Sequence, residues 1–169
     1  MKDIYIGIGS NLGDRLGNCN RAVKEILAYP HIEFKRLSPW YLTEPIGMIS
    51  DRWFVNGVLS IKSHISALEL LKILLCIEIN MGRKRDKGNR YQSRTIDLDI
   101  LFYGMDIINK PELKIPHPEI KRRRFVLKPL SDISPMLKHP LEGLTVKEML
   151  ENVKAKGQTV FLLTKELEL

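Results

Sequence analysis

Two aspartates, Asp97 and Asp99, carry the clearest chemistry in the sequence. They alternate with apolar residues over 95–102, a pattern typical of a β-strand, so both carboxylates are expected on one face, roughly 6.6 Å apart along the strand. The apolar residues are expected on the opposite face: Ile96, Leu98, Ile100 and Phe102. Adjacent carboxylates repel each other, and a divalent cation between them would remove that cost. Mg²⁺ prefers carboxylate oxygens combined with substrate phosphates.

A basic segment, residues 82–94, lies directly before this strand. It contains six basic side chains against the single acid Asp86: Arg83, Lys84, Arg85, Lys87, Arg90 and Arg94. A guanidinium is a planar fork that matches phosphate oxygens. Acid pair, metal and arginines together predict a phosphoryl-transfer centre. The residues alone leave one alternative open, a surface strand end with solvated acids beside a basic loop.

The positive charge of the chain is concentrated at two places. Residues 82–94 carry six basic and one acidic side chain, hence +5, and residues 121–124 carry +4, so a total of +7 leaves −2 for the rest. Such focused charge suits a compact polyanion, for example a nucleoside triphosphate, better than a long nucleic-acid backbone. We therefore expect no nucleic-acid partner. We also expect no membrane contact, because no apolar run reaches the roughly 20 residues of a span.

Length and composition favour a single globular domain over residues 1–169, with 44% hydrophobic residues to form its core. No targeting segment is recognised at the start of the sequence. The two cysteines, Cys19 and Cys76, lie in helical patterns and match no metal-binding spacing. We expect packed thiols in a reducing cytoplasm. The expected state is a monomer, and the sequence leaves a dimer open.

Alternating strands and helices are expected to position the acid pair. Strands are predicted over 4–8, 32–41, 53–61, 95–102 and 159–163, and helices over 16–27, 66–81 and 145–156. Residues 9–14 are expected to form a turn in which Asp14 caps the first helix, and Ser66 and Thr145 each open a capping box. The order strand, helix, strand, strand, helix, strand predicts an α+β sandwich of the ferredoxin-like type, a mainly antiparallel sheet covered by helices on one face.

Two further residues stand out by their position. Asn56 shares a strand face with Phe54 and Val58, so it is either a satisfied core amide or a donor–acceptor pair for a ligand. His117 lies between two prolines and close to the arginine run at 121–124, which makes it either a packing residue or a phosphate contact.

Four separated stretches of the sequence match one family. IGIGSNLGDR, YLTEPIG with FVNGV, GRKR with RTIDLDIL, and IPHPEIKRRRFVLKPL resemble the 6-hydroxymethyl-7,8-dihydropterin pyrophosphokinases of folate biosynthesis. The resemblance covers nearly the whole chain. It implies a ferredoxin-like fold and an enzyme that transfers the β,γ-diphosphate of ATP to the hydroxymethyl group of the pterin, releasing AMP.

The resemblance also implies roles for single residues. Catalytic roles fall to Arg83, Arg94, Asp97 and Asp99, of which the two aspartates hold two Mg²⁺ ions. Contacts with ATP fall to Glu78, Arg83, Arg85, Arg94, His117 and Arg123. The pterin pocket is implied to contain Thr43, Glu44, Ile46, Phe54, Asn56, Tyr91 and Phe125, with Asn56 bonded to the ring and Phe125 stacked on it. Two mobile loops, 47–51 and 86–93, are expected to close over the site.

Departures from the family pattern concern two places. Tyr91-Gln92-Ser93 stands where relatives usually have Trp-Gly-Pro, and Pro118 stands where some have Tyr. These changes affect stacking area and one ATP contact, and leave the aspartates and Arg94 in place. Two other functions fit parts of the sequence. A nucleotidyltransferase would place its Gly-Ser close before the acids, unlike Ser10, and an RNA-binding ferredoxin-like module would present aromatics on its middle strands.

Overall fold

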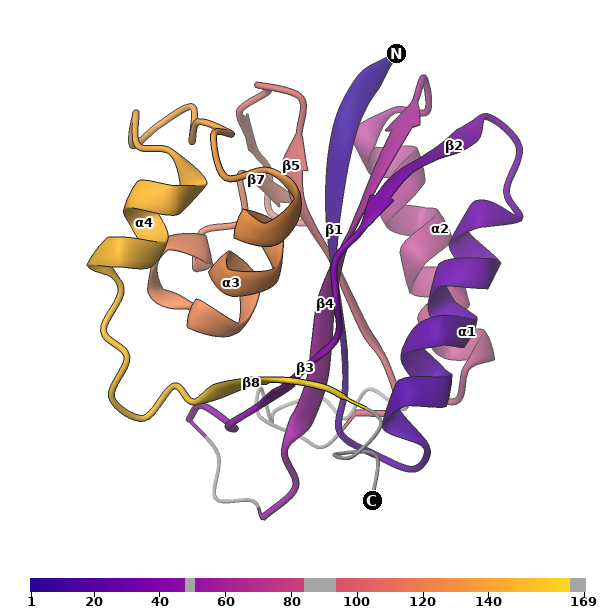
Figure 1. Cartoon of the computed structure of the whole chain (residues 1–169). Helices are drawn as coiled ribbons and strands as arrows, with labels where there is room; N and C mark the ends of the chain where they lie inside the picture. The colour runs from indigo at the N-terminus through magenta and orange to yellow at the C-terminus, as the bar shows by residue number, and fades with distance from the viewer. Residues whose placement is uncertain (48–50, 84–93, 165–169) are drawn as a thin grey trace.

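The fold is a layered α/β/α arrangement built on one central sheet (Figure 1). It is seen in a computed structural model that describes residues 1–47, 51–83 and 94–164. In this part of the chain the main sheet has six strands: β1 (Lys2–Ser10), β2 (Ile32–Leu37), β3 (Tyr41–Thr43), β4 (Phe54–Ser63), β5 (Asp97–Tyr103) and β8 (Val160–Leu162). The helices are α1 (Arg15–Leu27), α2 (Ala67–Asn80), the 3₁₀ helix η1 (Ile120–Arg122), α3 (Arg124–Ile133) and α4 (Val146–Asn152).

The strand order is β5-β1-β4-β3-β8, and β2 also pairs with β4. Each of these pairs is antiparallel. A small separate hairpin joins β6 (Ile108–Asn109) to β7 (Lys114–Ile115). The α+β class and the antiparallel sheet are therefore as predicted.

The strand predicted over 32–41 is in fact two strands on one edge of β4. β2 pairs with the second half of β4 and β3 with its beginning. Between them the chain leaves the ladder at Ser38 and Pro39. The Ser38 hydroxyl accepts a bond from the Val58 N–H at 2.9 Å, and a proline has no N–H to continue a strand.

Helices cover both faces of the sheet, so the prediction of one covered face was wrong. α1 and α2 lie on one side, and α3 and α4 on the other (Figure 1). The side chains of β1 show why both faces are covered. Ile4 and Ile6 pack toward α1 and α2, and Tyr5 packs toward α3 and α4. A sheet with apolar residues on both faces needs cover on both. The sequence reading missed α3, whose apolar residues share a helical period: Val126, Leu127, Leu130 and Ile133.

A bulge in β5 also changes one prediction. Tyr5 pairs with Phe102 and Ile6 with Ile100, so Leu101 is an extra residue in the ladder. Ile96, Leu98 and Ile100 face α1 and α2 as predicted. Phe102 does not share their face, because after the bulge it packs with α3 and α4.

The helix starts follow their predicted caps. Asp14 accepts from the Gly17 N–H at 3.0 Å, and Thr145 with Glu148 forms a complete capping box. Ser66 accepts from the Glu69 N–H, but its predicted box lacks the return bond from the Glu69 side chain. α4 ends at Asn152, four residues earlier than predicted. β1 extends to Ser10, so residues 9 and 10 belong to the strand and not to the predicted turn.

Other predictions concern the cysteines and membranes. Cys19 is buried, and burial raises the pKa of its thiol to about 12, whereas Cys76 is exposed and is not the packed thiol that was predicted. Among the described helices, none has the length and apolar character to cross a membrane.

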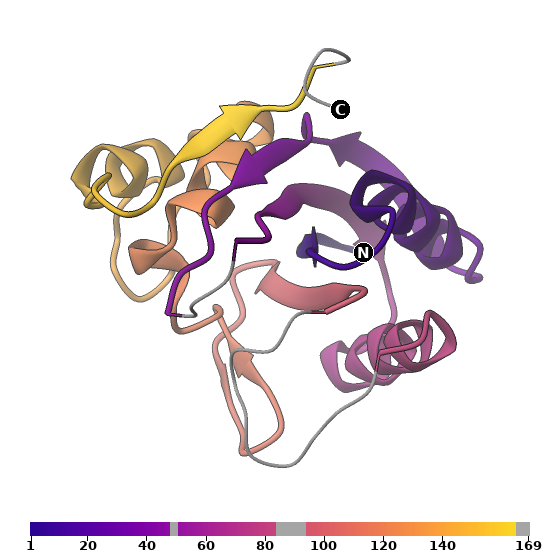
Figure 2. The same cartoon turned by 90° about the horizontal axis from the view of Figure 1, so that it is seen from below.

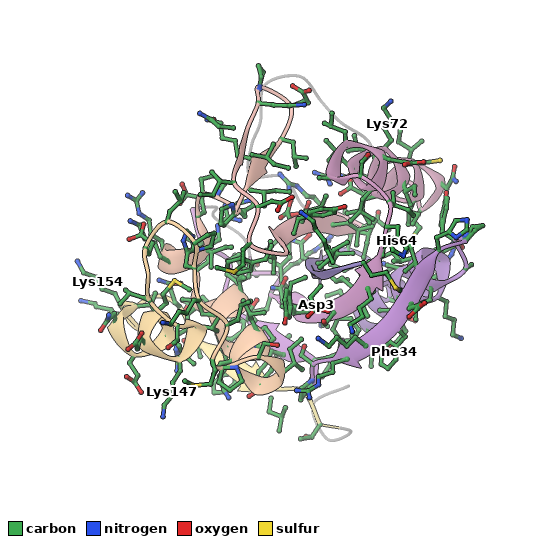
Figure 3. The ribbon with its side chains drawn as sticks, turned by 90° about the horizontal axis from the view of Figure 1, so that it is seen from above. Asp3, Phe34, His64, Lys72, Lys147 and Lys154 are labelled. Carbon is green, nitrogen blue, oxygen red and sulfur yellow. The ribbon has the colours of Figure 1, made fainter. Side chains whose placement is uncertain are left out.

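The sheet has two distinct ends. Asp3 near the start of β1 and His64 after the end of β4 lie at one of them (Figure 3). Gly9 near the end of β1 pairs with Asn56 near the start of β4 and with Asp97 at the start of β5, which defines the other end. The predicted site residues gather there.

Candidate active site

A cavity of about 350 Å³ lies over this second end of the sheet, on the side of α3. β1, β4 and β5 form its floor with Gly7, Gly9, Asn56, Asp97 and Asp99. One wall is formed by Thr43 at the end of β3, by Glu44 and Ile46 after it, and by Phe54 at the start of β4. The other wall runs from His117 through the start of α3: His117, Glu119, Arg122, Arg123, Phe125 and Val126.

The two aspartates face the cavity together, as the strand alternation predicted. Asp97 is held by two arginines: its Oδ1 lies 2.9 Å from Nη1 of Arg83, and its Oδ2 lies 2.9 Å from Nη1 of Arg94. Asp99 makes no hydrogen bond or ion pair with the rest of the described chain. The two carboxylates therefore lie in different surroundings, although they are two residues apart.

Burial and the Asp97 carboxylate raise the pKa of Asp99 from an ordinary value of 3.8 to about 7. Glu78 acts in the same direction, and Arg123 and Arg94 oppose it. The charged form of Asp99 is thus disfavoured because it is desolvated and lies near another anion. A cation bound at this point would stabilise the ionised pair.

Glu78 and Arg83 lie behind the acid pair and do not line the cavity. Glu78 is 1% exposed, and its Oε1 accepts the Leu98 N–H at 2.9 Å and pairs with Nη1 of Arg83 at 2.5 Å. Arg83 in turn contacts Asp97. In this arrangement the pair connects the end of α2 to β5 and orients Asp97, and the ATP contact implied for both residues stays a prediction.

Arg94 is fixed by a residue that the sequence reading missed. The buried Asn11 donates its N–H to the Arg94 carbonyl at 3.0 Å and accepts the Arg94 N–H at its Oδ1 at 2.6 Å. These two bonds join the chain just after β1 to a residue three positions before β5. The only available signal was the place of Asn11 in the stretch IGIGSNLGDR.

His117 lines the cavity as a neutral donor. Burial, assisted by the positive charge of Arg123, lowers the pKa of His117 to about 4. Its Nδ1 accepts the Glu119 N–H at 3.2 Å, so the ring proton is on Nε2. Its backbone N–H donates to the Leu101 carbonyl at 3.0 Å, which ties this segment to β5.

A polar and an aromatic group face each other across the remaining part of the cavity. Nδ2 of Asn56 donates to Oγ1 of Thr43 at 2.6 Å, and both residues are buried. The Phe125 ring lies on the opposite wall, with the guanidinium of Arg123 5.6 Å from its centroid. Asn56 is thus both a satisfied amide and a cavity residue, so the two readings of its sequence position are compatible.

Gly9 allows this arrangement. A Cβ at this position would lie 2.4 Å from Oδ1 of Asn56, well inside contact distance. Gly7 lies in the strand as predicted and Gly9, predicted in the turn, also belongs to it; both line the cavity floor. Glu119 and Arg122 also line the cavity and were not predicted; they belong to the same segment as His117 and Arg123.

Glu44 and Ile46 line the cavity as predicted, but the Glu44 carboxylate is engaged elsewhere. Its Oε2 accepts the Thr159 N–H at 3.0 Å, next to β8. Arg85, Tyr91 and the whole of the predicted loop 86–93 lie outside the described residues, as do residues 48–50 of the other predicted loop.

Comparison with known proteins identifies the chain. The family model for 7,8-dihydro-6-hydroxymethylpterin-pyrophosphokinase (HPPK) matches residues 5–135, which is most of the sequence. The chain belongs to the HPPK family. It is an enzyme that transfers pyrophosphate from ATP to hydroxymethyldihydropterin in folate synthesis.

Curated relatives support the HPPK assignment over nearly the full length. The chain is 37% identical over 157 residues to 2-amino-4-hydroxy-6-hydroxymethyldihydropteridine pyrophosphokinase of Pseudomonas aeruginosa, covering 93% of this chain and 95% of that one. It is 36% identical over 148 residues to the Synechocystis enzyme of the same name, with coverage of 88% and 74%. The predicted resemblance is confirmed, and the nucleotidyltransferase and RNA-binding alternatives are set aside.

Solved structures share the HPPK fold at low sequence identity. A structure of Plasmodium falciparum HPPK-DHPS superposes with a TM-score of 0.70 at 14% identity, covering 89% of this chain. The chain spans 45% of that longer protein. This likeness shows the fold alone.

Proposed function

We propose that the cavity described above is the site of diphosphate transfer and that Asp97 and Asp99 hold two Mg²⁺ ions there. One observation carries this proposal. The same cavity is lined by an acid pair, by two arginines and a histidine suited to phosphate, and by an aromatic ring opposite a buried amide. The triphosphate is assigned to Arg94, His117 and Arg123. The pterin is assigned to the space between Phe125 and Asn56, bordered by Phe54 and Ile46.

The acid pair fits a hard cation by its chemistry and its electrostatics. Two carboxylates supply oxygen ligands, and Mg²⁺ takes its remaining ligands from water and substrate phosphates rather than from a full protein cage. The raised pKa of Asp99 supports this reading, because it indicates a carboxylate whose charge lacks compensation in the chain itself. Bound Mg²⁺ would neutralise phosphate charge and acidify the attacking hydroxyl.

The remaining residues bind, orient and stabilise charge. Arg94 and Arg123 place guanidiniums where negative charge spreads over the transferred group, and fixed cations there lower the barrier. His117 donates through Nε2 to a phosphate oxygen as a neutral imidazole. Arg83, held by Glu78, keeps the Asp97 carboxylate directed into the cavity.

The pterin assignment follows from the shape and edge of the ligand. A pterin is flat and carries an amide-and-amine edge, so it needs an aromatic face and polar groups at its rim. The Phe125 ring stacks on the flat face of the pterin. The Asn56 amide, held by Thr43, bonds to the polar edge of the pterin. We further propose a single-domain, monomeric enzyme of the cytoplasm that binds neither nucleic acid nor membranes.

Product analysis tests the reaction. The purified protein is incubated with Mg·ATP and 6-hydroxymethyl-7,8-dihydropterin, and nucleotides and pterins are separated by chromatography. We expect AMP and the pterin diphosphate in equal amounts. Formation of ADP or of inorganic pyrophosphate would contradict the proposed reaction.

A separate measurement tests the metal assignment. Isothermal titration of Mg²⁺ together with a non-hydrolysable ATP analogue should show binding to the wild-type protein and much weaker binding to Asp97→Asn and Asp99→Asn. Unchanged metal-dependent binding in both variants would contradict a metal site at the acid pair.

A further inference from the structure

The segment from Lys154 to Thr159 connects the two walls of the cavity, although it lies outside the part of the chain that the family model matches, residues 5–135. β8 follows this segment and lies along β3, close to the start of α3 (Figures 1 and 2). The connection involves Gln158 on the side of α3 and Thr159 on the side of β3.

Gln158 caps the helix that carries Arg123 and Phe125. The N-cap position of α3 is Arg123, and its side chain makes no capping bond. The first helical N–H, that of Arg124, instead donates to Oε1 of Gln158 at 2.9 Å. Helix starts leave such N–H groups without intrahelical partners, and a side-chain acceptor stabilises them. Here the acceptor is 34 positions further along the chain.

The amide of Gln158 is itself held in a defined orientation. Its Nε2 donates to the Lys154 carbonyl at 3.0 Å, and its backbone N–H donates to the Ala155 carbonyl at 3.0 Å. The Gln158 carbonyl accepts from Nη1 of Arg124 at 3.2 Å. Four bonds therefore fix this residue against the turn before it and against the start of α3.

The next residue reaches the opposite wall. Thr159 donates its N–H to Oε2 of Glu44 at 3.0 Å, and its carbonyl accepts the Glu44 N–H at 3.0 Å. β8 then continues this contact, with Val160 opposite Thr43 in the ladder. The Phe161 ring also stacks on Trp53 at 5.9 Å, beside the pocket residue Phe54.

We propose that Gln158 is a positioning residue for the pterin substrate: through the adjacent Thr159–Glu44 contact it sets the separation between Phe125 on α3 and the Thr43–Asn56 wall. The inference rests on the proposed assignment of the pterin to this space. Gln158 does not line the cavity, so its influence passes through the two walls. Two of the residues assigned to the triphosphate, Arg94 and His117, are held by separate contacts with Asn11 and Leu101. The third, Arg123, lies at the helix start that Gln158 caps.

Steady-state kinetics and calorimetry with three variants test this role. In Gln158→Ala we expect the KM and the calorimetric Kd for hydroxymethyldihydropterin to rise about 5- to 20-fold, the range that the loss of one or two ordered hydrogen bonds produces. The KM for ATP should rise less than the KM for the pterin, because Arg94 and His117 keep their own contacts and only Arg123 shares the capped helix start. Gln158→Glu keeps an acceptor for the Arg124 N–H but loses the Nε2 donor to the Lys154 carbonyl, so it should restore pterin binding in part. Lys156→Ala, an exposed neighbour in the same turn, is the matched control and should behave as wild type.

The outcomes separate this inference from the proposed function. Unchanged pterin binding in Gln158→Ala would overturn the positioning role. A parallel loss of pterin affinity, ATP affinity and melting temperature would also overturn it, because that pattern indicates a general structural effect. A wild-type protein that forms no AMP and pterin diphosphate would contradict the proposed function itself, and the inference with it.

Discussion

Asp97 and Asp99 are alike in sequence and different in their surroundings. Asp97 lies between two guanidiniums, and Asp99 is desolvated beside Asp97 without a partner in the described chain. The first is fixed before any ligand arrives. The second carries an electrostatic cost that a bound cation would relieve. This difference leads to separate predictions for the two residues.

Asp99→Asn should stabilise the metal-free protein at high pH. The folded-state pKa of about 7 exceeds the unfolded value near 4, so the native state binds more protons between these values and wild-type stability falls as pH rises from about 4 to about 7. A difference of about three pKa units corresponds to about 4 kcal/mol as an upper limit. We expect the variant to gain about 2–4 kcal/mol at pH 8, or roughly 4–16 °C in melting temperature, and nothing at pH 4. Thermal melts in EDTA at both pH values measure this.

The control is Asp106→Asn, because Asp106 is an exposed aspartate in a surface ion pair with Lys2. Exposed pairs contribute little, so its melting temperature should change by about 1 °C or less. An Asp99→Asn protein that is no more stable than wild type at pH 8 would contradict the raised pKa.

Asp97→Ala should reduce kcat by at least ~10²–10³-fold while the protein remains folded, since the change removes a proposed metal ligand that acts in the transition state. It also leaves Arg83 and Arg94 without their shared carboxylate. Turnover is followed by AMP formation, and circular dichroism checks folding. Near-normal turnover would refute the role of the acid pair.

Gly9→Ala should weaken pterin binding selectively. The added methyl group would approach Oδ1 of Asn56 to 2.4 Å and push the amide away from Thr43. We expect the KM for the pterin to rise about 10-fold or more, while the KM for ATP changes little. Gly143→Ala, at an exposed turn with φ +70°, should lose stability through backbone strain away from the cavity and leave pterin binding unchanged, so it controls for a general loss of stability. Equal pterin affinity in Gly9→Ala and wild type would contradict the close packing at this point.

Among the secondary-structure elements, β1 has the largest part in organising the site. It pairs with β4 and β5, and its last residues connect the pterin wall to the acid pair. Asn11, just after β1, then holds the backbone of Arg94 by two hydrogen bonds. A residue with no expected ligand contact thus determines where a proposed catalytic guanidinium lies.

Asn11→Ala should therefore slow the reaction without contacting either substrate. The change removes the acceptor for the Arg94 N–H in a buried place, so the segment before β5 loses its fixed position. We expect kcat to fall about 10-fold or more, with a smaller change in the KM for the pterin. Asn109→Ala, at an exposed position of β6, is the matched control. An Asn11→Ala enzyme with wild-type kcat would show that Arg94 is held by other contacts.

For the molecule as a whole, the place of the cavity follows from the two helical layers. α1 and α2 lie against one face of the sheet and α3 and α4 against the other (Figure 1), and the cavity lies beside the start of α3, over the end of the sheet that contains Gly9 and Asp97. Large exposed apolar residues of the described chain are spread over several elements, from Phe34 on β2 to Met136 after α3, and two of them, Phe161 and Leu162, are neighbours on β8, where Phe161 stacks on Trp53. No pattern among these residues indicates a built interface between copies.

We accordingly expect a monomer in solution. Light scattering coupled to size-exclusion chromatography should give a mass near 19.5 kDa at micromolar concentration. A concentration-independent mass near twice this value would contradict the prediction.

Short-range patterns in the sequence determined much of the protein. Alternation placed Asp97 and Asp99 on one strand face, and helical spacing with capping residues located α1, α2 and α4, because these signals depend on neighbours within a few positions. The motif resemblance placed Asn56, His117 and Phe125 in one site, and the structure brings them to one cavity.

Only the tertiary structure decided the rest. The bulge at Leu101, the cover of both sheet faces and the partners of Glu78 depend on how strands pair and layers pack. Asn11 meets Arg94 across 83 positions, and Glu44 meets Thr159 across 115. Contacts at such separations arise from the register of whole elements, and no local pattern of residue types encodes them.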